Sequence, residues 1–427
     1  MKISLSYVIK VSVIIPLLLL ASCEDQDNQE RVVKKNYFGM HIGNSTKFSP
    51  IVTPYHNQGY GSVRFWDTNT NWRQLEPQKG HFNFEKLDQM VSTAIKNHQE
   101  ILMTLGQPPN WATGGKSSSK YGENYNSLPP TDIRDWSNYV KTIGNRYKGK
   151  IKFFEVWNEP NIINFYSGSM EELVSLTREA NYVLKKIDPN IKIVSPSTTD
   201  RNTGPKFLDG FLKAGGKEFV DVIGVHLYVS PALPEEAIPL IQDYRKVMAN
   251  NNVGHLPLWD TEFTWLNFKL NGTEKSIGLN ETSVIMPTKL ASSYLARSLL
   301  IGLGMGVERR FFYGLDYPAS KIRLIDLKDP QRLLLPGKTY KNITTWLTDS
   351  TIQDFSYKFL EEIYVMSILS SEGKKGIIAW TEGSKKILKL PSEFKKEGEY
   401  VSVIGENDEY SDGKVVLTNI PILVYED

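Results

Sequence analysis

The sequence predicts an α/β protein: a (β/α)8 TIM barrel followed by a small C-terminal β-sandwich domain. Three observations support this prediction. The chain has 427 residues, which suits one barrel with an accessory unit. Short apolar runs alternate with amphipathic helical segments through most of its length. After Asp349 the pattern changes to closely spaced strand-like runs separated by turns rich in Gly, Asn and Asp. These runs are Ile363–Leu369, Lys375–Thr381, Lys386–Leu390, Tyr400–Ile404 and Lys414–Tyr425.

Eight strand-like runs define the predicted barrel. Most are continuous apolar runs rather than strict alternations, as expected for strands that are buried on both faces of a parallel sheet. The runs are Tyr37–Ile42, Ser62–Asp67, Glu100–Gly106, Ile151–Pro160, Ile191–Thr198, Val220–Tyr228, Leu256–Trp265 and Val307–Asp316.

Amphipathic helices separate these runs. Phe84–His98 and Ile133–Tyr147 each gather apolar residues on one face, and Ser169 with Glu172 forms a capping-box pattern before another apolar face. An open, doubly wound sheet is the alternative arrangement. It would need a nucleotide-binding fingerprint, and the sequence contains neither GxGxxG nor GxxxxGK[ST].

The domain boundaries follow from these patterns. We expect a lipoprotein signal peptide over residues 1–22, an acidic tether over 23–35, the barrel over 36–348 and the β-sandwich over 349–427. Three long loops follow the third, seventh and eighth runs, where barrel enzymes keep their active sites. They are Ala112–Pro130, Asn267–Thr282 and Pro318–Pro336.

The N-terminal segment predicts export and lipidation. Lys2 and Lys10 precede an apolar run, Val11–Leu20, that is too short to span a membrane as a helix. It ends in Leu20-Ala21-Ser22-Cys23, which resembles a bacterial lipobox with lipidation at Cys23; a plain cleaved signal is the alternative. The acidic stretch Glu24–Glu30 resembles the export signal of surface lipoproteins. We therefore expect a lipoprotein anchored in the outer membrane and exposed at the cell surface.

Charge and composition exclude several functions. The chain carries 50 Lys and Arg against 48 Asp and Glu, and loss of Lys2 and Lys10 with the signal would make it neutral. A general attraction to nucleic acid is therefore not expected. The six His are scattered, no HExxH motif occurs, and Cys23 is the single Cys. We accordingly expect no metal and no cofactor.

Two glutamates carry the chemistry. Glu159 ends the fourth run within Trp157-Asn158-Glu159-Pro160, and Glu262 ends the seventh run. The fourth and seventh strands of a barrel face each other, so these carboxyl groups can flank one glycosidic bond. A Glu in an apolar pocket has a raised pKa and can donate a proton, while its partner must stay ionised. Arg64, at the end of the second run, is a candidate to hold that partner ionised.

These motifs resemble those of clan A glycoside hydrolases, and within them family 39 and its relatives. The resemblance covers most of the barrel, and its motifs are Phe38–Ile42, Ser62–Asp67, Trp72, Glu76–Gly80, Thr104–Ala112, Trp157–Pro160 and His226–Tyr228. It implies a retaining mechanism with Glu159 as acid/base and Glu262 as nucleophile.

The resemblance also implies supporting roles. Asn158 would contact the sugar 2-hydroxyl, Arg64 would support the nucleophile, and His226 with Tyr228 would line the sugar site. The eighth run lacks the Trp that many clan members carry there, and Tyr313 is expected to take its place.

Several assignments have structural alternatives. Asp260 is the nearest rival to Glu262 as nucleophile. Glu155 faces the same way as Glu159 but lies deeper, so a structural pairing is expected for it. His41 either faces the sugar or is a core histidine. Trp111 and Trp265 either stack on sugar rings or pack within loops.

The function expected from the sequence is a retaining glycoside hydrolase. It would cleave O-glycosidic bonds of an extracellular polysaccharide or oligosaccharide by double displacement, without a cofactor. Its partners would be a carbohydrate substrate and the membrane that holds its lipid anchor. Two alternatives remain at this point: a non-catalytic glycan-binding surface lipoprotein on the same barrel, and a transglycosylase.

Overall fold

The computed structural model describes residues 30–42, 59–116, 126–266, 286–315, 320–326, 328–329, 331–358 and 361–426. The expected signal peptide, the lipidation site Cys23 and the loop Asn267–Thr282 lie outside these residues. Parts of the other two long loops, Ala112–Pro130 and Pro318–Pro336, also lie outside them.

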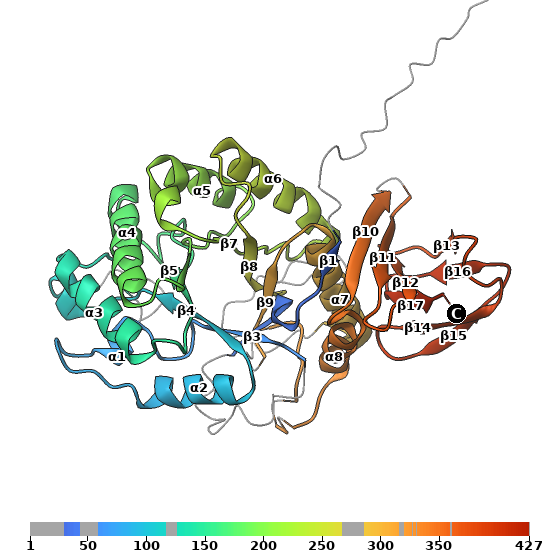
Figure 1. The fold of residues 1–427 in the computed structure, drawn as a ribbon, viewed down its shortest axis with the longest axis horizontal. Coiled ribbons are helices and arrows are strands. Elements are labelled where there is room, and N and C mark those ends of the chain that lie inside the picture. The colour runs from blue at the N-terminus through green and yellow to red at the C-terminus, as the bar shows by residue number, and fades with distance from the viewer. Residues whose placement is uncertain are drawn as a thin grey trace, which may run out of the picture.

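A parallel sheet of eight strands forms the centre of the molecule (Figure 1). Its order is β6-β5-β4-β3-β2-β9-β8-β7, and isolated parallel bridges from Val194 to Val222 and from Thr198 to Val225 join the two ends. The strands are β2 (Phe38–His41), β3 (Ser62–Phe65), β4 (Glu100–Leu105), β5 (Phe153–Val156), β6 (Lys192–Val194), β7 (Ile223–Val225), β8 (Leu258–Phe263) and β9 (Arg309–Tyr313). The predicted (β/α)8 barrel is confirmed, with one of the expected runs in each strand.

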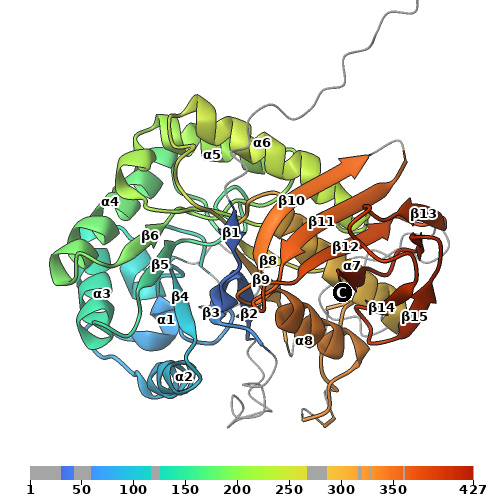
Figure 2. The same ribbon diagram turned by 45° about the vertical axis from the view of Figure 1, so that its right-hand side comes forward.

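Helices surround this barrel (Figure 2). The α-helices are α1 (Trp72–Leu75), α2 (Glu85–Lys96), α3 (Ile133–Arg146), α4 (Met170–Ile187), α5 (Gly204–Lys213), α6 (Ala237–Asn250), α7 (Thr288–Gly304) and α8 (Leu335–Leu347). Short 3-10 helices are η1 (Lys35–Tyr37), η3 (Asn110–Thr113), η4 (Gly216–Phe219) and η5 (Pro234–Glu236). The predicted capping box is present at the start of α4, where Ser169 and Glu172 each bond the other's backbone N–H.

A second layer of antiparallel strands follows α8. Its larger sheet has the order β1-β10-β11-β12-β17-β14-β15, and β13 pairs with β16 in a smaller sheet. The strands are β1 (Arg31–Val32), β10 (Thr351–Lys358), β11 (Ile363–Leu369), β12 (Lys375–Thr381), β13 (Lys386–Lys389), β14 (Gly398–Ser402), β15 (Asn407–Tyr410), β16 (Lys414–Leu417) and β17 (Ile422–Tyr425). Apolar residues that include Ile377, Val415 and Val424 are buried in a separate small core of this layer. The predicted β-sandwich is thereby confirmed.

Three details of this layer differ from the prediction. The run Lys414–Tyr425 forms two strands, because Pro421 has no N–H to donate to a ladder and the chain turns before β17. Strands β10 and β15 were not expected. The residues expected to end the tether, 31–35, take part in the fold: β1 pairs with β10, and Val33 is buried and bonded to Ser350 and Asp349 through its backbone (Figure 2).

The barrel and the sandwich share one packed interface. Helix α7 is buried on every side from Ala291 to Leu303, because the barrel lies on one side of it and the sandwich on the other (Figure 1). Within this interface the Arg297 guanidinium forms an ion pair with Glu235, and the Trp380 indole donates to the same carboxylate over 2.8 Å. The sandwich is thus tied to the loop that follows β7. None of the described helices is long and apolar enough to cross a membrane.

The interior of the barrel is filled by side chains. Leu102, Val194, Val222, Trp259 and Phe311 form a buried apolar cluster contributed by strands from around the sheet. Such a barrel is a packed core rather than a pore. Polar side chains therefore gather above this cluster, at the carboxyl ends of the strands.

Candidate active site

Arg64 is the centre of the polar layer at the carboxyl ends of the strands. Its Nη1 donates to Oε2 of Glu262 over 2.7 Å, and its Nη2 donates to Glu155 over 2.7 Å and to Oδ1 of Asn158 over 2.6 Å. Burial alone would lower the pKa of Arg64, but the two carboxylates raise it, so the cation is permanent. The guanidinium thus joins three strands through one rigid fork.

Glu155 has the structural pairing that its deep position on β5 predicts. Its carboxylate accepts from Arg64 Nε over 3.0 Å, from the Thr104 hydroxyl over 2.5 Å and from the Ser197 hydroxyl over 2.5 Å. Burial would raise the pKa of Glu155, but Arg64 and the hydroxyl donors hold it below its ordinary value. Both oxygens are hydrogen-bonded inside the protein and the residue is fully buried, so this carboxylate orients Arg64 and is not available to a substrate.

The backbone turns sharply where the acid-bearing motif leaves β5. Trp157 (φ 71°) and Glu159 (φ 46°) both lie in the left-handed region, which is unfavourable for residues with a Cβ. Hydrogen bonds hold this conformation: Trp157 N–H donates to Leu105 O over 2.8 Å, and Glu159 N–H donates to Ser197 O over 2.9 Å. The result is that Asn158 faces Arg64 while the Glu159 side chain reaches His226.

Glu159 lies in a weakly polar setting. His226 Nδ1 is 2.8 Å from its Oε1, and the carboxyl group is almost fully buried. Burial raises the pKa of Glu159 to about 7, while a hydrogen bond with Thr199 works against that rise. Burial also lowers the pKa of His226, so the imidazole is neutral and does not drive the ionisation of Glu159.

Glu262 has two hydrogen-bond donors that favour its ionised form. Oε2 accepts from Arg64, and Oε1 accepts from the Tyr228 hydroxyl over 2.8 Å. Burial raises the pKa of Glu262 above its ordinary value, although Arg64 and the Tyr228 hydroxyl act to lower it. Because each oxygen has its own strong donor, Glu262 is suited to stay ionised beside a protonated Glu159.

The two glutamates are close together. One ligand-capable atom from each of Glu159, His226 and Glu262 lies within 4.8 Å of the others, and all three residues are buried. These are therefore the described residues that could hold a metal ion. Glu262 already accepts from Arg64 and Tyr228, and Glu159 already contacts His226 Nδ1, which favours a site for acid/base chemistry over a metal centre.

His41 and Tyr313 form the side of the site next to Glu262. His41 Nδ1 lies 3.8 Å from Glu262 Oε2, and its ring packs edge-on against Tyr313 with centroids 4.4 Å apart. The Tyr313 hydroxyl donates to Asp67 over 2.7 Å, and Asp67 N–H points to His41 Nε2 over 3.4 Å. Burial, with Arg64, keeps the pKa of His41 well below its ordinary value, so this ring is neutral. His41 is therefore buried, as expected for a core histidine, and also lies beside Glu262, as expected for a residue that faces the sugar.

Asp260, the rival to Glu262, is occupied elsewhere. Its carboxylate pairs with Arg310 over 2.7 Å and accepts from Leu227 N–H over 3.0 Å. Burial raises the pKa of Asp260 and Arg310 opposes that rise. The ion pair and the backbone hydrogen bond together occupy both oxygens of the Asp260 carboxylate.

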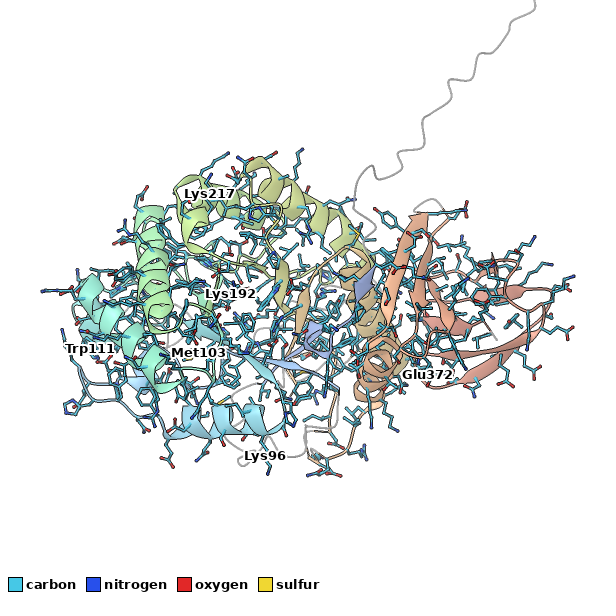
Figure 3. The ribbon with its side chains drawn as sticks, in the orientation of Figure 1. Lys96, Met103, Trp111, Lys192, Lys217 and Glu372 are labelled. Carbon is cyan, nitrogen blue, oxygen red and sulfur yellow. The ribbon has the colours of Figure 1, made fainter. Side chains whose placement is uncertain are left out.

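The two tryptophans at the loops are placed in packing contacts. Trp265 is buried against Tyr294 and donates its indole N–H to Ala232 O over 3.2 Å. Trp111 lies at the edge of the ribbon in Figure 3, packs edge-on against Trp72, and donates to Glu76 O over 3.0 Å. These contacts favour the packing alternative for both rings.

Several polar groups in the site were not expected from the sequence. Thr104 and Ser197 fix Glu155, Thr261 donates to Ser197 over 2.8 Å, and Thr199 bonds Glu159. These hydroxyls lie at the ends of β4, β6 and β8, so their position in the sequence could have indicated that they face the site. Their residue type was not, because Ser and Thr are common in any barrel strand.

Comparison with known proteins agrees with this geometry. The family model described as "Glycosyl hydrolases family 39" matches residues 50–263. The β-xylosidase of Caldicellulosiruptor saccharolyticus is 29% identical over 156 residues, which are 34% of this chain and 31% of that protein. The β-xylosidase of Geobacillus stearothermophilus is 22% identical over 260 residues, 54% of this chain and 49% of that protein. The matched region thus spans half or less of these curated relatives.

A solved structure extends the likeness in fold to nearly the whole chain. The family 39 glycoside hydrolase from the gut symbiont Bacteroides cellulosilyticus WH2 superposes with a TM-score of 0.70 and 19% sequence identity. The superposition covers 93% of this chain and 82% of that chain.

Proposed function

This chain belongs to glycosyl hydrolase family 39, and on that premise we propose that it is a retaining glycosidase that uses Glu159 as acid/base and Glu262 as nucleophile. The closeness of the two carboxyl groups, with one oxygen of each within 4.8 Å of the other, is the observation that carries this proposal. Retaining pairs stand about 5–5.5 Å apart, whereas inverting pairs need about 6.5–9.5 Å to admit a water molecule.

In the first step the two groups act on opposite sides of the glycosidic bond. The ionised Glu262 attacks the anomeric carbon and forms an ester to the sugar. The bond to the leaving oxygen breaks, and Glu159 transfers its proton to that oxygen. A pKa of about 7 keeps Glu159 protonated up to neutral pH, and burial is the cause.

In the second step the roles of the groups change. Glu159, now a carboxylate, takes a proton from water, whose oxygen attacks the anomeric carbon. The ester to Glu262 breaks and the carboxylate is restored to its donors, Arg64 and Tyr228. Two displacements return the original anomeric configuration, and each proton and electron pair is accounted for within the pair of glutamates.

We further propose that the substrate is an extracellular oligosaccharide or polysaccharide with β-linked xylose as the first sugar to test. Both curated relatives described above carry the name β-xylosidase. The site adds a physical reason for a neutral sugar, because Glu159 and Glu262 already supply two carboxyl groups around a single Arg64.

The test is a stereochemical and trapping experiment. Proton NMR during hydrolysis of a 4-nitrophenyl β-glycoside should show the β-anomer of the free sugar first. A 2-deoxy-2-fluoro glycoside with a good leaving group should label Glu262, identified by peptide mass spectrometry. First appearance of the α-anomer, or labelling of Asp260, would contradict the assignment.

The same experiment separates the alternatives that the sequence left open. Binding of glycans without release of any product would identify a non-catalytic glycan-binding protein. Transfer to an added alcohol or sugar in preference to water would identify a transglycosylase, because both reactions share the same covalent intermediate.

We also propose that Cys23 is lipidated and anchors the protein in the outer membrane, with the barrel at the cell surface. The lipobox-like Leu20–Cys23 and the acidic stretch after it support this proposal. Cells grown with an alkyne-tagged fatty acid should label the wild-type protein and not Cys23→Ser. External protease should degrade the anchored protein on intact cells; protection would contradict surface exposure.

A further inference from the structure

We propose that Gln107 binds the substrate directly and decides which sugar the site accepts, by hydrogen bonding through its amide to hydroxyl groups of the glycone. This inference rests on the proposed glycosidase function and deepens it.

The first observation is the position of Gln107 in the fold. It follows β4 by two residues, and β4 lies between β3, which carries Arg64, and β5, which leads to Glu159. On this strand Thr104 already reaches the polar layer through Glu155. Gln107 therefore stands at the carboxyl end of the strand, on the face of the barrel where the candidate active site lies.

The second observation is that the backbone of Gln107 is held in an unfavourable conformation. Its φ of 58° is left-handed, as it is at Trp157 and Glu159 on the neighbouring strand end. The carbonyl groups of Gly106 and Gln107 accept from Trp72 N–H and Arg73 N–H over 3.3 and 3.2 Å. The start of α1 thus fixes this turn. Because the turn is not extended, the Gln107 side chain does not follow the in-and-out alternation of β4.

The third observation is that the Gln107 amide is buried with its hydrogen-bonding capacity unused. The residue is 0% exposed, and neither Oε1 nor Nε2 has a hydrogen-bond partner among the described residues. Native proteins pair nearly all buried polar groups, so an amide with both ends unmatched needs an explanation. A ligand that brings a donor and an acceptor supplies one.

Two other buried groups in the site have the same property. Asp67 N–H points to His41 Nε2, which places the proton of this neutral ring on Nδ1, and that atom has no hydrogen-bond partner. His226 uses Nδ1 toward Glu159 and leaves Nε2 without one. The ends of β2, β4 and β7 thus offer, among the described residues, one ring N–H, one amide and one ring nitrogen.

This set fits a polyhydroxylated ring. Each sugar hydroxyl both donates and accepts, and a carboxamide can accept from one hydroxyl while it donates to its neighbour. A site built to hydrogen-bond a substrate hydroxyl rejects the analogue that lacks it, because the buried protein group is then left unpaired. Gln107 would accordingly discriminate between glycones at the hydroxyl that it contacts.

The chain offers a matched control at the other end of the same strand. Gln99 immediately precedes β4, is 7% exposed, and also has an amide oxygen without a hydrogen-bond partner among the described residues. It stands at the amino end of β4, remote from the carboxyl ends where the glutamates gather. Gln99→Met therefore makes the same chemical change in a buried amide away from the proposed site.

The experiment compares Gln107→Met, Gln107→Leu and Gln99→Met with the wild type. Aryl glycosides of common pentoses and hexoses identify the preferred glycone, and kcat/KM is then measured for it and for its monodeoxy analogues, together with Tm. We expect Gln107→Met to lower kcat/KM for the preferred glycoside at least tenfold. It should also abolish the wild-type preference over one deoxy analogue, with Tm unchanged or raised. Gln99→Met should leave kcat/KM and the preference unchanged.

Three results would overturn the inference. In the first, Gln107→Met keeps the wild-type preference over every deoxy analogue. In the second, its Tm falls while its selectivity is retained, which would assign the amide a packing role. In the third, neither Gln107 variant folds. If the wild-type protein hydrolyses no glycoside, the proposed function is contradicted together with this inference. If the wild type is active and Gln107→Met has the same kcat/KM and selectivity, only this inference is contradicted.

Discussion

Arg64 on β3 donates to Glu262 on β8 over 2.7 Å, although β2 and β9 lie between these two strands in the sheet. The contact crosses the mouth of the barrel and gives Glu262 a permanent positive partner. Glu159 has instead a neutral imidazole, His226, at 2.8 Å. Burial raises the pKa of both carboxyl groups, but at Glu262 it is opposed by the Arg64 cation and by the Tyr228 hydroxyl. Of the two, Glu159 is therefore better suited to keep the proton, as double displacement requires.

Removal of either glutamate should stop turnover without unfolding the protein. Loss of the proposed nucleophile in Glu262→Ala, or of the proposed proton donor in Glu159→Ala, should lower kcat by roughly a thousandfold or more. Added azide should restore part of the turnover of Glu159→Ala on a substrate with a good leaving group and yield a glycosyl azide. Circular dichroism checks the fold, and unchanged kcat in either variant would refute the corresponding role.

Activity should fall on both sides of a pH optimum. Glu159 must carry a proton in the first step, and its pKa is raised to about 7, so kcat/KM should decrease as the pH rises through that value. Glu262 must be ionised, so kcat/KM should also decrease toward acid pH. With an activated aryl glycoside, Glu159→Gln should lose the alkaline decrease; a variant that keeps it near pH 7 would show that another group is responsible.

Tyr228→Phe should move the acid side of this profile. The Tyr228 hydroxyl donates to Glu262 over 2.8 Å and acts to lower the pKa of that carboxyl group. Without it the pKa of Glu262 rises, so the acid decrease in kcat/KM should shift to higher pH. Loss of one hydrogen bond to a charged group should also reduce kcat/KM by about ten- to a hundredfold. An unshifted acid side would argue that the hydroxyl does not reach the ionised nucleophile.

Asp260→Asn should damage stability far more than chemistry. Asp260 forms a buried ion pair with Arg310, and removing one partner of such a pair costs about 3–5 kcal/mol of unfolding free energy. Turnover per folded molecule should stay within about tenfold of wild type, since Glu262 keeps its donors. Urea unfolding and active-site titration measure the two effects. If Asp260→Asn folds but has no turnover, Asp260 is again a candidate for the nucleophile.

Much of the architecture can be predicted from local patterns. The eight buried runs, the capping box at Ser169 and the turn-separated strands after Asp349 are properties of short segments, and each appears in the structure. The pairing of Arg31–Val32 with β10 could not be predicted in this way, because β1 depends on a partner more than 300 residues distant in the chain. The split of Lys414–Tyr425 does have a local signal in Pro421.

For the candidate site, the sequence by itself determined the chemical groups and the strand ends on which they stand. Glu159, Glu262, Arg64 and Asn158 follow from motifs, because a residue that ends a barrel strand must face the mouth of the barrel. Only the tertiary structure decided which group each one contacts. In the structure Arg64 contacts Glu262 and Glu155. Glu159 contacts His226, and Asp260 forms an ion pair with Arg310. These contacts, and the burial that raises the pKa of Glu159 to about 7, depend on the closure of the sheet and on side chains from strands that are distant in the chain.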